Sequence, residues 1–173
     1  MSTGLVTIVH GRHGHLLRQW EGLASSTTQP DVAVVVAMDD PGVAALCLSS
    51  GSLRPEIVEI PKARLGLPLA AARNAGARRA ISSGADTVIF LDVDCIPSAA
   101  MIAAYRATAN EERWSDSVLC GPVSYLPPAT EAGYELQSLN LMAKPHAARP
   151  APDEGEVTPG GAVTAGHFEK KPQ

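Results

Sequence analysis

The stretch Thr87-Val88-Ile89-Phe90-Leu91-Asp92-Val93-Asp94 joins a short apolar run directly to two carboxylates. The run is rich in β-branched and aromatic residues, which is typical of a buried strand. Asp92 and Asp94 stand two positions apart, so in extended backbone their side chains are expected to project in the same direction. The stretch therefore predicts a central strand that ends in two converging acidic groups.

Strand and helix signals alternate around this stretch. Apolar runs predict further strands at 5–9, 31–38, 56–60 and 117–121. Helical spacing or Ala-rich composition predicts helices at 16–23, 68–83 and 97–108. In the last two helices a proline occupies the first turn, where its missing N–H costs nothing. This alternation predicts an α/β fold with a mostly parallel sheet that is flanked by helices on both faces.

The composition limits the classes of function that the chain can serve. Its 173 residues suit one domain, and a hydrophobic content of 45% supplies a core. The formal net charge of −4 argues against a general nucleic-acid binder, which should be basic. We find no apolar run long enough for a transmembrane segment and no signal peptide. Three scattered cysteines form no CxxC pair, so we expect reduced thiols and a cytoplasmic location.

The end of the chain has a different composition from the rest. Half of the 14 prolines lie after residue 126, and no Leu, Ile, Met, Trp or Tyr follows Met142. A segment with so few core-forming residues cannot offset the entropy that it loses on ordering. We therefore predict a globular domain over residues 1–143 and an irregular, disordered Pro/Gly-rich tail over residues 144–173.

Asp92 and Asp94 are the candidate metal ligands. In open α/β sheets, ligands bind beyond the carboxyl ends of the strands, which is where these two residues follow their strand. Two converging carboxylates repel each other, and a hard divalent cation resolves that conflict. We therefore expect Mn²⁺ or Mg²⁺ to bind here together with a diphosphate group. The alternative is a pair of solvated carboxylates in a turn.

Arg73 is a second candidate, near the start of the helix that precedes this strand. The neighbouring small residues Ala70, Ala71, Ala75 and Gly76 should let the helix lie close to the sheet. An arginine in this place could reach a phosphate or a ribose with its forked donors. The alternative is an ordinary exposed arginine on a helix.

Further candidates follow the first and second predicted strands. Asp39 and Asp40 end the second strand, where a carboxylate could accept a hydrogen bond from a base N–H or a ribose hydroxyl. The alternative is a simple turn, for which Asp-Asp-Pro-Gly is well suited. The glycine-containing loop from His10 to Arg12 is expected to approach a ligand, with Arg12 contacting phosphate or base. The histidines of this loop have no matching Cys or His ligands elsewhere, so structural zinc is disfavoured.

Taken together, these residues resemble the donor half of the family 2 glycosyltransferases, which are GT-A enzymes that use nucleotide-diphosphate sugars. The likeness covers residues 4–126. It rests on the first strand, an aspartate that ends the second strand, Arg73-Asn74-Ala75-Gly76, and Phe90-Leu91-Asp92-Val93-Asp94. The resemblance implies a GT-A, Rossmann-like fold and the transfer of a sugar to an acceptor hydroxyl.

The resemblance also implies what individual residues do. Asp39 matches the carboxylate that holds the nucleotide base, and Arg73 matches the basic residue near the base and diphosphate. Asp92 matches the position that contacts ribose or metal, and Asp94 matches the metal ligand on the diphosphate. The metal would neutralise the leaving nucleoside diphosphate. Family members typically invert the anomeric carbon, with a carboxylate base that deprotonates the acceptor.

The chain departs from that family in two places. The loop after the first strand often carries Pro and Asn-type residues in the family, whereas here it is His10-Gly11-Arg12. The Trp/Gly-rich Glu-Asp motif of the acceptor half is missing, so the sequence names neither a catalytic base nor an acceptor. We expect a fragment, a truncated product or a protein that a partner completes. Apolar surface left exposed in this way would favour self-association.

Two other classes of function remain open. A non-catalytic relative would bind a nucleotide sugar without transferring or hydrolysing it, as the missing acceptor half suggests. A phosphatase of the haloacid-dehalogenase type also places D-x-D after a strand, with the first aspartate as nucleophile. In those enzymes the motif usually opens the domain and is followed by Thr, whereas here it is central and followed by Cys95-Ile96.

Overall fold

The computed structural model describes residues 1–49, 53–64, 66–128, 134–146, 157–158, 162–163 and 168–170. The elements in chain order are β1 (Thr3–Val9), α1 (His13–Ala24), β2 (Val32–Met38), α2 (Gly42–Ser49), β3 (Glu56–Ile60), α3 (Leu69–Ser82), β4 (Thr87–Phe90), β5 (Cys95–Pro97), α4 (Met101–Ala109), η1 (Glu112–Trp114), β6 (Val123–Tyr125), η2 (Leu136–Ser138), α5 (Leu139–Met142), β7 (Lys144–Pro145), β8 (Val157–Thr158), β9 (Ala162–Val163) and β10 (Phe168–Lys170). None of the helices in the described ranges combines the length and the apolar character that crossing a membrane requires.

The main sheet is parallel, and its four strands have the order β3-β2-β1-β4. β1 lies in the interior of the sheet, where Leu5 pairs with Ala33 of β2 on one side and with Ile89 of β4 on the other. The chain therefore proceeds outward from β1 to β3 and then returns to place β4 on the opposite side of β1. The parallel sheet predicted from the apolar runs is confirmed, and so is the α/β fold class.

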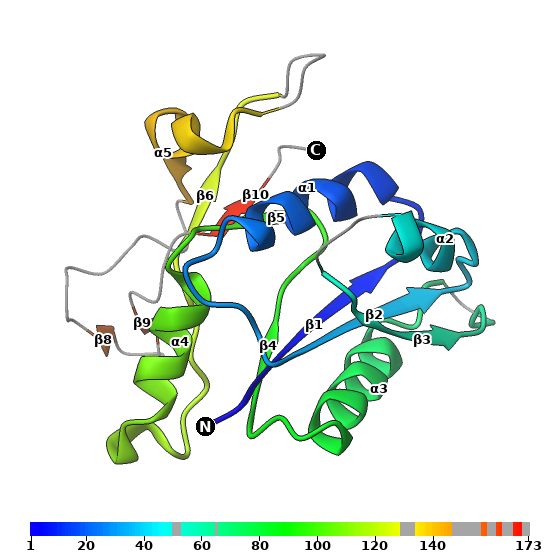
Figure 1. Ribbon diagram of the computed structural model, residues 1–173, viewed down its shortest axis with the longest axis horizontal. Helices are drawn as coiled ribbons and strands as arrows, with labels where there is room; N and C mark the ends of the chain where they lie inside the picture. Colours follow the sequence, from blue (N-terminus) through cyan, green and yellow to red (C-terminus); the bar gives the residue numbers. More distant parts are fainter. Residues whose placement is uncertain are drawn as a thin grey trace.

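Helices cover both faces of this sheet, with α1 and α2 on one side and α3 on the other (Figure 1). Successive residues of β1 point to opposite faces. Leu5 and Val9 pack in a cluster with buried side chains of α1, α2 and α4. Val6 and Ile8 pack in a second cluster with α3. The helices flanking both faces, which the continuous apolar strands predicted, are thus confirmed.

α3 lies very close to the sheet because its inward face is made of small residues. The buried positions are Ala72, Gly76 and Ala80, which recur at every fourth residue. A Cβ atom added at Gly76 would lie 2.3 Å from a side-chain carbon of β1. Close packing through small residues was expected, but part of the expected set is wrong, since Ala70 and Ala71 are exposed.

α2 is an element that the sequence analysis did not predict. Residues 39–42 turn the chain as expected, and Asp39 has a positive φ of 50°, which aspartate tolerates better than most residues. The helix begins directly after this turn, at Gly42. Val43 is buried in the cluster shared with α1 and α4. Burial against the sheet therefore supports a helix where the local pattern showed only the turn.

Two elements after β4 differ from the sequence prediction. The helix expected over residues 97–108 begins only at Met101, because Pro97 belongs to β5. The strand expected at 117–121 is wrong, since Val118 is exposed and residues 117–119 form no strand. The neighbouring strand β6 forms instead because it finds partners in β7 and β10. Apolar composition alone did not show that β6, and not the run at 117–121, would have neighbouring strands to pair with.

A second, smaller sheet has the order β5-β10-β6-β7. In this sheet β10 is antiparallel to β5 and parallel to β6. β8 and β9 form a separate antiparallel pair. In its described residues, the segment predicted to be an irregular tail, residues 144–173, thus contains the short strands β7, β8, β9 and β10. Apart from β8, β9 and β10, the residues after His146 lie outside the described ranges. The domain division at residue 143 therefore stays a prediction.

Candidate functional site

The carboxyl ends of β1 and β4 mark the place where this sheet would bind a ligand. The chain passes from β1 to β2 on one side, whereas β4 lies on the other side of β1. In open α/β sheets, the crevice at such a reversal of strand order is where ligands bind. The loop after β1 contains His10 and Arg12, and the segment after β4 contains Asp92 and Asp94. The topology therefore brings four of the predicted site residues to one edge of the sheet.

The aspartate turn, which we define as residues 92–95, does not have the extended backbone predicted for it. The amide of Cys95 donates to the carbonyl of Asp92 at 2.9 Å, which closes a turn around Val93 and Asp94. The side chain of Asp92 is 54% exposed, whereas that of Asp94 is 8% exposed. The extended geometry is therefore wrong, and the two carboxylates lie in different surroundings.

Asp94 is paired with Arg12. The Nη1 atom of Arg12 donates to Oδ2 of Asp94 at 3.0 Å. Isolating a carboxylate from water is costly unless a positive charge accompanies it, and the guanidinium supplies that charge here. The pair links the loop after β1 to the aspartate turn, so it also holds together the two segments that flank the reversal point.

Arg73 forms a second pair with the aspartate turn. Its Nη2 atom donates to Oδ1 of Asp92 at 3.0 Å. α3 leads into the start of β4, so its first turns lie at the carboxyl edge of the sheet. Both partners are substantially exposed, so this pair contributes little to stability. Its significance is positional, because it brings a second guanidinium to the two aspartates.

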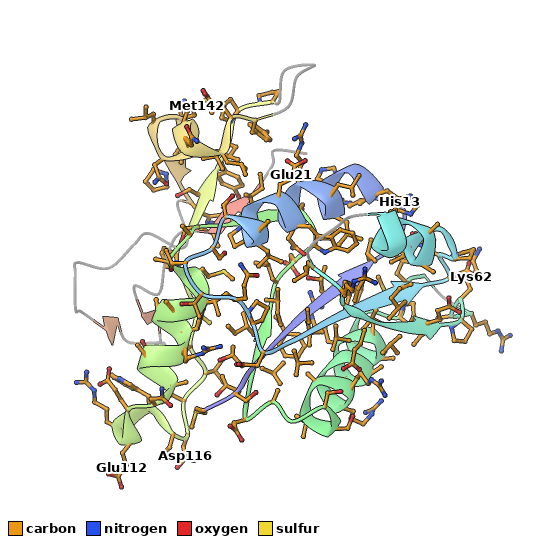
Figure 2. The ribbon with its side chains drawn as sticks, in the orientation of Figure 1. His13, Glu21, Lys62, Glu112, Asp116 and Met142 are labelled. Carbon is orange, nitrogen blue, oxygen red and sulfur yellow. The ribbon has the colours of Figure 1, made fainter. Side chains whose placement is uncertain are left out.

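The loop after β1 is held to the end of β2 by Asp40. The carboxylate accepts hydrogen bonds from the amide of Gly11 at 2.8 Å and from Nε2 of His13 at 2.9 Å. Partial burial acts to raise the pKa of Asp40, but these hydrogen bonds outweigh it and hold the pKa below its usual value of 3.8. Gly11 has φ +70°, a conformation that glycine adopts without strain. Figure 2 shows His13 at the start of α1, close to α2.

His10 and Asp39 lie at the same edge of the sheet. The Nδ1 atom of His10 lies 2.6 Å from the carbonyl oxygen of Met38. A carbonyl only accepts, so Nδ1 carries the hydrogen in this contact. Asp39 is exposed at the end of β2. The carboxylate that holds the loop is therefore that of Asp40, whereas the side chain of Asp39 is exposed on the surface.

Gln19 is a residue of this site that the sequence analysis missed. Its side chain is fully buried between α1 and the sheet. Its Oε1 atom accepts a hydrogen bond from the hydroxyl of Thr7 at 2.8 Å. Its Nε2 atom donates to the carbonyl of Asp92 at 2.8 Å and to that of Cys95 at 3.3 Å. These bonds fasten both ends of the aspartate turn. The available signal was a glutamine among the apolar residues of its helix.

The side chains of the aspartate turn suit a hard divalent cation that binds together with a diphosphate. Mg²⁺ and Mn²⁺ prefer oxygen ligands, and Mg²⁺ is usually held by one or two carboxylates with substrate phosphates. Within the described ranges, no cluster of three or more His, Cys, Asp or Glu side chains could hold a metal on its own. By residue type, Asp92 and Asp94 could supply oxygen ligands, and phosphate oxygens and water would have to supply the others.

Comparison with known proteins shows a shared fold. No family model matches the chain, and no curated protein matches it. Among solved structures, it is similar to the crystal structure of S. aureus TarS 1–349, with a TM-score of 0.52 and 14% identity. The match covers 78% of this chain and 38% of the TarS chain, so our chain spans well under half of that structure. At this identity the likeness shows a shared α/β fold alone.

Proposed function

We propose that the chain binds a nucleotide-diphosphate sugar and is the donor-binding part of a metal-dependent glycosyltransferase. The observation that carries this proposal is the meeting of Arg12, Arg73, Asp92 and Asp94 at the reversal point of the sheet. Two carboxylates suit a divalent cation, and two guanidiniums suit a diphosphate. The fold is shared with TarS, a wall teichoic acid glycosyltransferase, and this likeness supports the proposal.

The aspartates and the arginines would hold different parts of the donor. Asp92 and Asp94 would hold Mn²⁺ or Mg²⁺, which when bound supplies charge neutralisation to the leaving diphosphate. Arg12 and Arg73 would donate hydrogen bonds to phosphate oxygens from opposite sides of the aspartate turn. The diphosphate would thereby be oriented by side chains from three separate elements.

The nucleoside would lie toward the ends of β1 and β2. With Nδ1 engaged with the backbone, Nε2 of a neutral His10 would accept a hydrogen bond from a base N–H. The carboxylate of Asp39 is exposed at the end of β2 and would accept from a base N–H or a ribose hydroxyl. The hydrogen bonds of Asp40 to Gly11 and His13 keep this loop in place.

Sugar transfer needs a further group that takes a proton. The acceptor oxygen bonds to the anomeric carbon while the bond to the diphosphate breaks, and the hydroxyl proton passes to a base. The described residues single out no such base. Glu135 is one candidate by type, but it precedes η2 and accepts a hydrogen bond from Ser138 of that short helix. We propose that a further segment or a partner supplies the base and the acceptor site.

Calorimetric titration tests the donor site directly. We expect either UDP or GDP to bind the folded chain in the presence of Mn²⁺, and to lose binding when EDTA is added. Asp94→Asn should abolish the metal-dependent binding, because it removes a ligand charge. Asp116→Asn is the matched control, since Asp116 is exposed beyond the end of α4, and it should bind as the wild type does.

The titration also separates the competing functions. Binding that persists in EDTA would contradict the metal-dependent site. Metal-dependent binding without transfer or hydrolysis of the sugar donor would favour a non-catalytic binding module. The absence of binding by either nucleotide, in a chain shown to be folded by circular dichroism, would reject the proposed function.

A further inference from the structure

The two arginine–aspartate pairs of the site are unequal. Asp92 is 54% exposed and Arg73 40% exposed, so water screens their attraction. Asp94 is only 8% exposed, so its charge is poorly hydrated, and the guanidinium of Arg12 offsets it. In the free protein, the carboxylate of Asp94 is therefore neutralised by a side chain of the same molecule.

A divalent cation and Arg12 would compete for the carboxylate of Asp94. The Nη1 atom of Arg12 stands 3.0 Å from Oδ2, and a second positive charge at that oxygen would be repelled. The Arg12 side chain is 47% exposed and comes from a loop, where it directly follows Gly11. It therefore has room to leave Asp94 without disturbing the sheet or the buried helices.

We infer that Arg12 is an exchangeable counter-ion, which neutralises Asp94 in the free protein and moves to the donor diphosphate when a divalent cation binds. The inference rests on the proposed function. A diphosphate offers Arg12 a forked anionic partner to replace the carboxylate that it gives up. The cation alone must displace a guanidinium that gains nothing in return. Cation and nucleotide are therefore expected to bind with positive coupling, each strengthening the other by the same factor.

Substitution of Arg12 is predicted to change the two affinities in opposite directions. In Arg12→Gln, Mn²⁺ alone should bind about tenfold more tightly, because its competitor is gone. In the presence of saturating Mn²⁺, the nucleotide diphosphate should bind about tenfold more weakly, because a phosphate contact is lost. The resonance of free Mn²⁺ in electron paramagnetic resonance measures the first affinity, and calorimetry with UDP and GDP measures the second.

Arg18→Gln is the matched control for this experiment. Arg18 lies on α1, the helix that follows Arg12, and pairs with Glu21 on an exposed face at 2.6 Å. Its loss removes the same positive charge from the chain without touching the aspartate turn. Both affinities should stay at their wild-type values in this variant. An equal effect of the two substitutions would mean that only net charge matters, and would overturn the inference.

The metal-only measurement decides the inference independently of the nucleotide. A metal affinity in Arg12→Gln that equals or falls below the wild-type value overturns it, even where nucleotide binding is normal. Failure of the wild type to bind nucleotide would reject the proposed function, whereas the metal-only comparison would still decide the exchange. Should Arg12→Gln fold poorly, Arg12→Lys keeps the charge and loses the fork. In Arg12→Lys, measured against the wild type, the nucleotide should bind more weakly at saturating Mn²⁺ because the forked contact to phosphate is lost, and an unchanged nucleotide affinity would overturn the exchange.

Discussion

Gln19 fixes the aspartate turn through hydrogen bonds to two backbone carbonyls. Gln19→Met keeps the side-chain volume but leaves the carbonyls of Asp92 and Cys95 without this donor. An unsatisfied buried polar group costs about 1–3 kcal/mol. We expect the free energy of unfolding of Gln19→Met to fall by that amount, as measured by urea denaturation.

Thr7→Val is the matched control for the Gln19 prediction. It removes the hydroxyl that donates to Oε1 of Gln19 but leaves the amide donors to the turn in place. Metal-dependent nucleotide binding should therefore weaken in Gln19→Met and stay near the wild-type value in Thr7→Val. Equal losses of affinity in both variants would show that Gln19 serves the core and does not position the aspartates.

Asp40 makes the stability of the folded chain depend on pH. Its pKa is held below 3.8 in the folded state, so the ionised group stabilises the fold above that pH. The stabilisation is lost as the pH falls from 3.8 through the lower, folded pKa. Asp40→Asn should therefore melt below the wild type at about pH 6, and the gap should narrow at about pH 3.

Thermal unfolding followed by circular dichroism at the two pH values tests the Asp40 prediction. Asp116→Asn again serves as the control, because Asp116 is exposed, and its melting temperature should track the wild type at both pH values. A gap for Asp40→Asn that is as wide in acid as near neutrality would show that the side chain acts through its shape and not through its charge.

Residue types of the candidate site were predictable from the sequence, but their partners were not. The sequence indicated four of these residues by their positions. Arg12, Asp92 and Asp94 follow apolar strands, and Arg73 lies near the start of a helix. That Arg12 meets Asp94 depends on the adjacency of β1 and β4, which lie far apart in the chain. Gln19 was not predicted, because its hydrogen bonds to the aspartate turn are made to backbone carbonyls and no sequence motif indicates such bonds.

The contact between α3 and β1 has no room for another atom at Gly76. A Cβ there would lie 2.3 Å from Cγ1 of Val6, a stiff β-branched residue in the buried centre of the sheet. Overpacking of this kind costs typically about 1–3 kcal/mol, which exceeds the helix propensity gained from replacing glycine. We expect Gly76→Ala to be less stable in urea denaturation.

Gly14→Ala is the control, and its stability is not expected to fall. Gly14 lies on α1 with open space around its Cα, so an added methyl group meets nothing. Alanine favours a helix over glycine, so this variant should be as stable as the wild type or slightly more stable. If Gly76→Ala behaved in the same way, the close approach of α3 to the sheet would be refuted.

Elements of the main sheet were predictable because strands buried on both faces leave continuous apolar runs. β2 and β3 were predicted to within a residue or so of their observed bounds. α2 was not predicted, because the strong turn signal at Asp39 and Asp40 lies directly before the start of this helix. The run at 117–121 was wrongly predicted to be a strand. A short apolar run does not indicate whether another strand lies beside it to pair with.

At the scale of the whole molecule, the order of elements placed the site better than any single motif did. Alternating strands and helices predicted the parallel sheet, and the carboxyl edge of such a sheet is where ligands bind. The second sheet could not be predicted, because β5, β6 and β10 come together from distant parts of the chain. Short strands of this kind depend on tertiary context more than on local propensity.

The position of β10 within the second sheet implies an order of assembly. All the strands of the main sheet lie before residue 91, so that sheet can condense as soon as this length of chain is available. The second sheet stays incomplete until residues 168–170 reach β5 and β6. Contacts so distant in sequence form slowly, since a long loop must close first. During synthesis, the parallel sheet would thus serve as the nucleus onto which β10 later docks.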